Sequence, residues 1–208
     1  MKKIIATLSL LTLSLSAQAS FINGQGSPSD DIALTGGTVL DFESTGVSNT
    51  ASLYLSGVQI TSNGQVEVDS DYSGSYNTRG NFHITNHGNA PTAWTFDFDS
   101  SVSAFGFLFG ASDVNWMVEA YAGATMLQQY IISPTRGSNA GDYFGISGSG
   151  ITQARLFSQG GQSDYVFVDD FTFTAPSEVP VPAAVWLFGT GLAGLMGVSR
   201  KKKQTLSA

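Results

Sequence analysis

Four carboxylates near the two ends of the central segment are the side chains best suited to metal chemistry in this sequence. Asp41 and Glu43 stand two residues apart in an expected strand, so both would lie on one face of it. Asp169 and Asp170 lie in the last expected strand. If these two strands pair, the four carboxylates meet, and calcium is the hard cation that such oxygen ligands bind outside a cell. If the strands do not pair, the same residues are solvent-facing positions at two unrelated edges.

Residues for covalent or acid–base catalysis are few. The chain has no cysteine and no Gly-x-Ser-x-Gly motif. Its two histidines, His83 and His87, are expected to be exposed, because apolar residues alternate around the first and a glycine turn follows the second. A carboxylate pair can hydrolyse a glycosidic bond, so an enzyme that acts on polysaccharide stays an alternative. We predict a non-catalytic protein.

Tyrosines at loops or outward-facing positions are the second kind of candidate. The rings of Tyr54, Tyr72, Tyr76, Tyr121, Tyr130 and Tyr143 belong to this group. Sugars stack their apolar C–H faces on such rings, although aromatic residues serve as core or rim filler just as often. Sugar binding is therefore a hypothesis at this point.

The charge distribution excludes two classes of partner. Between Ser20 and Glu178 lie all 16 acidic residues and only three arginines, so this stretch carries a formal charge of −13 and has no lysine. Such a field repels the phosphates of nucleic acids and anionic lipid headgroups. No nucleic-acid partner is expected.

The first 19 residues have the order of a secretory signal peptide. Lys2 and Lys3 precede an apolar run over residues 4–15, and the small residues Ala17 and Ala19 then frame a cleavage site. Cleavage after Ala19 would export the rest of the chain.

The C-terminal residues read as a membrane anchor. Residues 183–199 form an apolar stretch that is long enough, together with its proline flank, to cross a bilayer as a helix. The tail over residues 200–208 begins with Arg200, Lys201, Lys202 and Lys203, which should stay in the cytoplasm. The expected location is therefore the inner membrane, with residues 20–182 outside.

The same segment resembles the PEP-CTERM sorting signal of Gram-negative bacteria. The matching residues are Pro180, Val181, Pro182 and a Trp-Leu-Phe-Gly run that starts at Trp186, followed by the basic cluster. Pro-Val-Pro stands here where the family has Pro-Glu-Pro. The resemblance implies that an exosortase-like membrane protease processes the tail, which would place the protein at the cell surface or in the extracellular matrix.

Residues 38–174 are expected to form an antiparallel β-sandwich. Apolar residues alternate with a period of two, and Gly, Ser, Asn or Pro separates the runs every 8–12 residues. The expected strands cover residues 38–43, 53–61, 65–69, 81–85, 93–98, 102–109, 115–120, 126–132, 143–146, 152–157 and 165–174. Residues 20–37 are expected to be a partly ordered leader and residues 175–182 a linker.

Short motifs in this domain are similar to those of extracellular jelly-roll modules. Leu40-Asp41-Phe42-Glu43 and Phe167-Val168-Asp169-Asp170-Phe171 resemble the first and last strands of carbohydrate-binding and MAM-like domains. That resemblance implies an all-β jelly roll in which these strands pair around calcium. The predicted function is adhesion or polysaccharide binding in the envelope, and a purely structural surface protein is the second alternative.

Overall fold

Ten β-strands and one short 3-10 helix make up the regular structure in the computed structural model, which describes residues 18–86, 92–160 and 164–176. The chain divides into residues 1–176, to which all of these belong, and residues 177–208. The elements are β1 (Ser20–Gln25), η1 (Pro28–Asp30), β2 (Thr38–Leu40), β3 (Ser48–Leu55), β4 (Val58–Asp69), β5 (His83–Thr85), β6 (Ala93–Gly110), β7 (Trp116–Ala122), β8 (Thr125–Ile132), β9 (Asp142–Ser158) and β10 (Phe167–Thr174). All strand pairs are antiparallel, which confirms the prediction of an all-β antiparallel fold.

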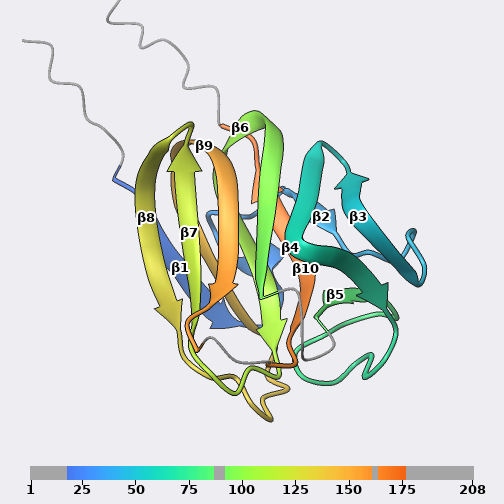
Figure 1. Cartoon of the computed structure of the whole chain (residues 1–208). Helices are drawn as coiled ribbons and strands as arrows, with labels where there is room; N and C mark the ends of the chain where they lie inside the picture. The colour runs from blue at the N-terminus through green and yellow to red at the C-terminus, as the bar shows by residue number, and fades with distance from the viewer. Residues whose placement is uncertain (1–17, 87–91, 161–163, 177–208) are drawn as a thin grey trace, which may run out of the picture. The chain divides into compact units, whose positions relative to one another are not determined.

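The two longest strands, β6 and β9, bend midway and take part in both layers of a sandwich (Figure 1). The first half of β6 pairs with β4 and with the second half of β9, whereas its second half pairs with β10 and with the first half of β9. One layer therefore contains β3, β4, β7 and β8, and the other contains β1, β2 and β10. Register shifts between Asp97 and Val102 mark the bend in β6, as expected where a strand passes from one sheet to another.

Aromatic side chains from both layers fill the interior. Phe96 of β6 stacks on Phe171 of β10, with ring centroids 4.3 Å apart. The expected alternation is confirmed in β6, where Trp94, Phe96 and Phe98 are buried while the residues between them are only partly buried. Burial of each large apolar side chain contributes about 1.5–3 kcal/mol, so this core accounts for much of the stability.

A second, smaller core lies on the outer face of β6 and β9. Ile22 of β1 and Leu34, which follows η1, pack there against Leu108 and Tyr143. β1 itself pairs with β9 from Ser20 onward. Residues 20–37 are therefore not a partly ordered leader, as expected from their composition, but a strand and a turn that cover the sheet.

Several strand boundaries differ from the prediction. The single strand expected over residues 53–61 is the hairpin of β3 and β4, which turns at Ser56 and Gly57 with φ of 47° and 87°. Two positive φ values in succession are typical of the tight turn that matches strand twist. The strands expected over 93–98 and 102–109 are one strand, β6, and those over 143–146 and 152–157 are one strand, β9.

Several of the longer connections between strands gather at one end of the sandwich, drawn at the bottom of Figure 1. Four of them, over residues 70–82, 111–115, 133–141 and 159–166, meet there, and we call this the loop end. Within the part of the chain that the structure describes, no helix has the length and apolar character needed to cross a membrane. The expected helix over residues 183–199 and the sorting motif lie outside the described residues.

Candidate functional site

A pocket of about 310 Å³ opens at the loop end, and three of its walls are tyrosine side chains. Tyr72 and Tyr76 come from loop 70–82, and Tyr165 lies two residues before the start of the last strand. Asp113 and Arg136 complete the polar part of the lining, so we call this the aromatic pocket. Concave sites of this size, with apolar walls and a few polar groups, are typical of small-molecule and sugar binding.

The three tyrosines surround one buried ring. The centroid of Phe167 lies 5.9 Å from those of Tyr72 and Tyr76 and 5.0 Å from that of Tyr165. Phe167 is 1% exposed, whereas Tyr72 is 56% exposed. The buried ring supports the others from below, and Tyr72, which also packs edge-on against Tyr76 and Tyr165, is the most exposed of the three.

Buried polar side chains tie the four connections to one another. Asn77, which is 4% exposed, donates to the Phe109 carbonyl at 2.9 Å and accepts the Gly141 N–H at 2.9 Å. The hydroxyls of Ser112 and Thr135 lie 3.0 Å apart and join the 111–115 and 133–141 connections. Fully buried hydrogen bonds of this kind fix one conformation.

Asp164 performs the same task next to Tyr165. Its carboxylate accepts the N–H of Asp113 at 2.8 Å and the indole N–H of Trp116 at 2.8 Å. Asp164 is 3% exposed, so these hydrogen bonds are protected from water. The positions of Asp113 and Tyr165 in the pocket are therefore set by the same buried carboxylate.

Backbone strain concentrates at this pocket. Tyr72, Tyr76, Asn77 and Ala111 all have positive φ, between 52° and 67°. This conformation costs a residue with a side chain about 1 kcal/mol or more, and it persists only where the surroundings impose it. Gly110 allows the main chain of Tyr76 to approach β6 this closely, because a Cβ at position 110 would overlap the Tyr76 carbonyl. Strain of this type is common at ligand-binding sites.

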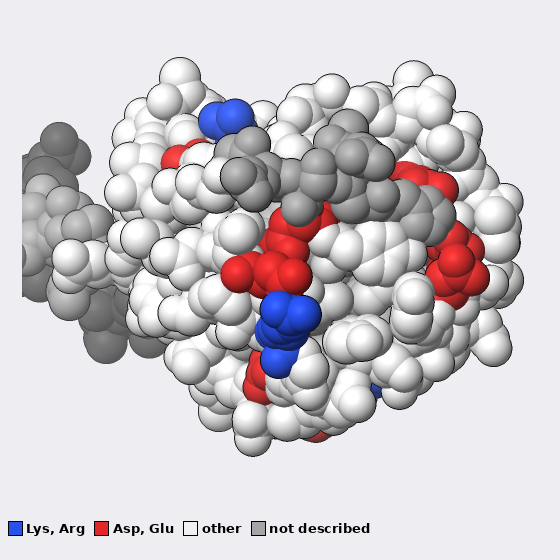
Figure 2. Space-filling model, turned by 60° about the horizontal axis from the view of Figure 1, so that its bottom comes forward, with Lys and Arg blue, Asp and Glu red and all other residues white. Residues whose placement is uncertain are grey.

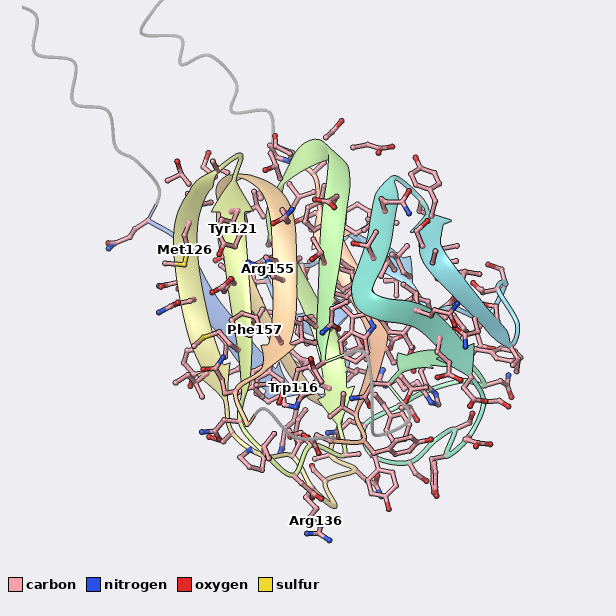
Figure 3. All side chains as sticks on the ribbon, viewed as in Figure 1. Trp116, Tyr121, Met126, Arg136, Arg155 and Phe157 are labelled. Carbon is pink, nitrogen blue, oxygen red and sulfur yellow. The ribbon has the colours of Figure 1, made fainter. Side chains whose placement is uncertain are left out.

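An exposed ion pair borders the pocket. The guanidinium Nε of Arg136 lies 3.1 Å from Asp113 Oδ1, and the two side chains are 78% and 52% exposed. Figure 3 shows Arg136 projecting from the loop end, and Figure 2 shows acidic side chains next to basic ones on an otherwise largely uncharged surface there. Both groups of the pair keep free hydrogen-bonding capacity toward solvent, since neither is enclosed.

The hydroxyl of Tyr165 stays protonated at neutral pH. Burial, and after it the charges of Asp71 and Asp69, raise its pKa to about 12. A protonated phenol can donate as well as accept a hydrogen bond. The negative charge of the two aspartates is therefore felt inside the aromatic pocket.

The expected pairing of the first and last strands is present, with Leu40 opposite Phe171, but β2 ends at Leu40, so Asp41 and Glu43 follow the strand and do not lie on one face of it. Burial is the main reason that the pKa of Asp170 is raised, and the negative charges of Asp41 and Glu43 still act on Asp170 and raise it as well. The Arg79 guanidinium lies 3.8 Å from the Asp170 carboxylate. We call Asp41, Glu43, Asp169 and Asp170 the carboxylate cluster.

Loop 70–82 supplies N–H donors to this cluster. Glu43 accepts the main-chain N–H groups of Asn81 and Phe82, the latter at 3.0 Å, and the Asn81 side-chain amide at 2.9 Å. These hydrogen bonds, those from Asn81 first, hold the Glu43 pKa below its usual range. Asp169 accepts the N–H of Arg79 at 2.7 Å. The cluster therefore holds the end of the loop that carries Tyr72 and Tyr76.

The fit of a calcium ion to the cluster depends on these donors. In the described part of the chain, no three His, Asp or Glu side chains are arranged to hold one metal ion. Both oxygens of Glu43 and both of Asp169 accept N–H groups, and an N–H group next to an oxygen disfavours a cation there. As the cluster stands, calcium would have to displace some of these hydrogen bonds. The calcium site stays a prediction.

A group of four polar and aromatic side chains lies on the outer face of β7 and β9, and Figure 3 labels three of them, Tyr121, Arg155 and Phe157. The hydroxyl of Tyr121 donates to Glu119 at 2.7 Å, and Arg155 lies 3.7 Å from the same carboxylate. The Arg155 guanidinium also lies 5.7 Å from the centre of the Phe157 ring. These groups satisfy one another, in contrast to the open ring faces of the aromatic pocket.

Comparison with known proteins finds only distant likeness. No protein-family model matches the sequence, and no curated protein matches it. Among solved structures, the carbohydrate-binding module TmCBM61, in complex with β-1,4-galactotriose, has a TM-score of 0.33 at 13% identity. The match covers 58% of this chain and 90% of the TmCBM61 chain. A family 29 carbohydrate-binding module has a TM-score of 0.32 at 11% identity, with 80% and 97% covered. The catalytic domain of a GH87 α-1,3-glucanase, in complex with tetrasaccharides, has a TM-score of 0.36 at 13% identity, with 77% and 31% covered. At such values the function of this chain must be argued from its own residues.

Of the six tyrosines proposed from the sequence, the structure places two, Tyr72 and Tyr76, in the aromatic pocket. Tyr143 is buried within the second core, whereas Tyr54, Tyr121 and Tyr130 lie elsewhere, against Asp99, Glu119 and Phe21. Sequence reasoning missed Tyr165, Asp113 and Arg136, since only the meeting of separate connections brings them together. His83, expected to be exposed, is fully buried in β5, all three residues of which are buried, and its ring centroid lies 4.7 Å from that of Phe167.

Proposed function

We propose that this chain is an exported envelope protein that displays a non-catalytic, jelly-roll polysaccharide-binding module, with the aromatic pocket as its sugar site. The observation that carries the proposal is the arrangement of three tyrosine rings and one Arg–Asp pair around a single pocket. Tyrosine faces stack on the C–H faces of sugars, and charged groups make strong hydrogen bonds to hydroxyls.

The rigidity of the pocket supports the same proposal. The rings are held by Phe167, the connections by Asn77 and Asp164, and the strained residues by their surroundings. A preorganised site loses little conformational entropy when a ligand binds. Packing alone does not require three strained residues next to an open pocket, so we attribute the strain to binding.

The composition of the lining favours binding over catalysis. Glycosidases use two carboxyl groups on either side of the scissile bond, about 5–9.5 Å apart. Among the described residues that line the aromatic pocket, Asp113 is the one carboxylate, and it is paired with Arg136. A polysaccharide-acting enzyme is therefore the weaker candidate, and a surface protein that binds no glycan is the other.

The processing of both chain ends is part of the proposal and rests on the sequence. Cleavage between Ala19 and Ser20 would leave β1 complete, since that strand begins at Ser20. The tail with Pro180, Pro182 and Trp186 would anchor the protein in the inner membrane until an exosortase-like protease acts on it. Calcium at the carboxylate cluster would have to replace some of the hydrogen bonds that hold loop 70–82.

A glycan array tests the sugar site directly. The purified chain, kept in mild detergent, is applied once with calcium and once with chelator, and hits are measured by calorimetry. We expect micromolar to millimolar binding to at least one polysaccharide fragment in both buffers. Binding that persists after the tyrosines of the pocket are replaced would place the sugar elsewhere, and no binding to any glycan would favour the purely structural alternative.

A further inference from the structure

All three arginines between Ser20 and Glu178 contact a carboxylate in the folded chain. Arg79 lies 3.8 Å from Asp170, Arg136 lies 3.1 Å from Asp113 and Arg155 lies 3.7 Å from Glu119. This stretch has no lysine. A negatively charged ligand would therefore have to compete with a carboxylate of the protein for every arginine available to it.

Acidic side chains outnumber basic ones in and around the aromatic pocket. In the lining, Asp113 lies 3.1 Å from Arg136, and the carboxylates of Asp69 and Asp71 act on Tyr165 from nearby. The charge of −13 on the surrounding stretch has the same sign. A charged ligand in the pocket is therefore subject to the net negative field of the surrounding stretch.

We infer that the aromatic pocket selects uncharged sugar chains and discriminates against chains that contain uronic acids. This inference rests on the proposed sugar-binding function and adds the class of glycan. Hydroxyl groups of a neutral sugar can donate to Asp113 and accept from Arg136 without separating the two. A uronate carboxylate can only accept, so it meets Asp113 as a like charge.

The experiment compares matched oligosaccharides that differ only in the carboxylate. Tetrasaccharides of β-1,4-linked glucose, β-1,4-linked mannose and α-1,4-linked galactose are each paired with the corresponding uronate, and dissociation constants are measured by calorimetry on the full chain in detergent. We expect each neutral sugar that binds to do so about five-fold or more tightly than its uronate at low salt. The gap should narrow as salt is added, because charge repulsion is screened and stacking is not.

The Asp113→Asn variant tests the effect of the negative charge at position 113, because asparagine has nearly the same shape as aspartate. It removes the negative charge from the pocket and leaves Arg136 without its carboxylate, so the affinity for uronates should move about two- to five-fold closer to that for neutral sugars. Asp99→Asn is the matched control, since Asp99 lies in the bend of β6 at the end of the sandwich opposite the loop end. It changes the net charge equally and should leave the ratio as in the unaltered chain.

Each outcome decides one of the two claims. A uronate that binds as tightly as its neutral partner, with calcium or with chelator, overturns the inference and leaves the sugar site standing. A preference that D99N reduces as much as D113N also overturns it, because the effect would then come from net charge alone. If no member of the three pairs and no glycan on the array binds, the proposed function itself fails.

Discussion

The main-chain N–H of Arg79 donates to the buried carboxylate of Asp169 at 2.7 Å, across 90 residues of sequence. Asp169 lies in the last strand, and Arg79 is near the end of the loop that carries Tyr72 and Tyr76. Glu43 takes the next N–H groups of the same loop. Gly80 is required between them, because a Cβ at that position would overlap the Glu43 carboxylate. Loop 70–82 therefore links the two sites: its last residues bind the carboxylate cluster, and its Tyr72 and Tyr76 line the aromatic pocket.

Asp169→Ala should lower the free energy of unfolding by about 1–3 kcal/mol, since it leaves buried N–H groups without an acceptor. Denaturant unfolding with chelator measures this loss, and the same experiment with calcium tests the predicted metal. Because Asp169 accepts its N–H groups without a metal ion, we expect the same loss of stability with calcium and with chelator. A loss that occurs only with calcium would instead show that calcium, and not the N–H groups, stabilises the cluster.

Asp169→Asn is the matched variant for this test. Its amide oxygen still accepts one hydrogen bond, and its volume is unchanged, so it should lose less stability than the alanine variant. Equal losses for the two variants would contradict a role for the hydrogen bonds and would point to packing.

Stability should fall as the pH rises from about 4 to about 8. Burial raises the pKa of Asp169 to about 8, above its usual value of 3.8, so the folded chain holds a proton that the unfolded chain releases. The contribution is fully present below the unfolded pKa and is lost as the pH rises through the folded one. One such group gives a slope of at most about 1.4 kcal/mol per pH unit. Denaturant unfolding at intervals of one pH unit measures it.

D169N provides the reference for the pH series, because the amide does not titrate. The slope between pH 4 and 8 should be shallower in this variant than in the unaltered chain. Identical slopes would show that Asp169 is not protonated in the folded state near neutral pH.

How much of the fold could be read from the sequence is clear from β6. The alternation of Trp94, Phe96 and Phe98 predicts a strand with one buried face, and the structure agrees. Residues 104–110 are all buried, because residues 20–37 cover the second face. The apolar residues Ala104 and Leu108 on that face were the sequence signal that a further segment covers it. The Gly- and Ser-rich composition of residues 20–37 suggested disorder and concealed that this segment is the one.

The candidate site could be predicted only in part, for a topological reason. Asp169 and Glu43 could be placed near each other from the sequence because the first and last strands pair, although β2 ends at Leu40, before Glu43. Tyr165, Asp113 and Arg136 lie on three different connections, whose mutual positions depend on buried hydrogen bonds such as those of Asp164. No sequence period reports contacts between separate loops.

Asn77→Ala should destabilise the chain by about 1–3 kcal/mol and weaken sugar binding, because it removes buried hydrogen bonds to Phe109 and Gly141. Asn77→Gly removes the same hydrogen bonds and also the cost of φ at 67°. The glycine variant should therefore be more stable than the alanine variant by about 1 kcal/mol. Thermal or denaturant unfolding compares the two, and a glycine variant less stable than the alanine variant would show that the positive φ is not strained.

The exported chain should begin at Ser20, which can be checked by intact-mass measurement on protein recovered from the envelope. β1 starts at this residue and pairs with β9, so cleavage there preserves the whole fold. Deletion of residues 179–208 should release the rest of the chain to the periplasm or medium. A mass that retains residues 1–19, or a deleted chain that stays in the membrane fraction, would contradict export and anchoring as proposed.

Tyr72→Ala should weaken glycan binding about ten-fold or more without a comparable loss of stability. Tyr72 offers an open ring face to the pocket and is 56% exposed, so truncation removes stacking area and leaves only a small cavity. Tyr54→Ala is the matched control, because Tyr54 is also 56% exposed but lies against Asp99, away from the loop end. Calorimetric titration of both variants with the glycan identified on the array should show a loss for Y72A alone. Equal losses of affinity in the two variants would mean that the sugar binds nonspecifically to exposed aromatic side chains. Unchanged binding in Y72A would show that the aromatic pocket is not the sugar site.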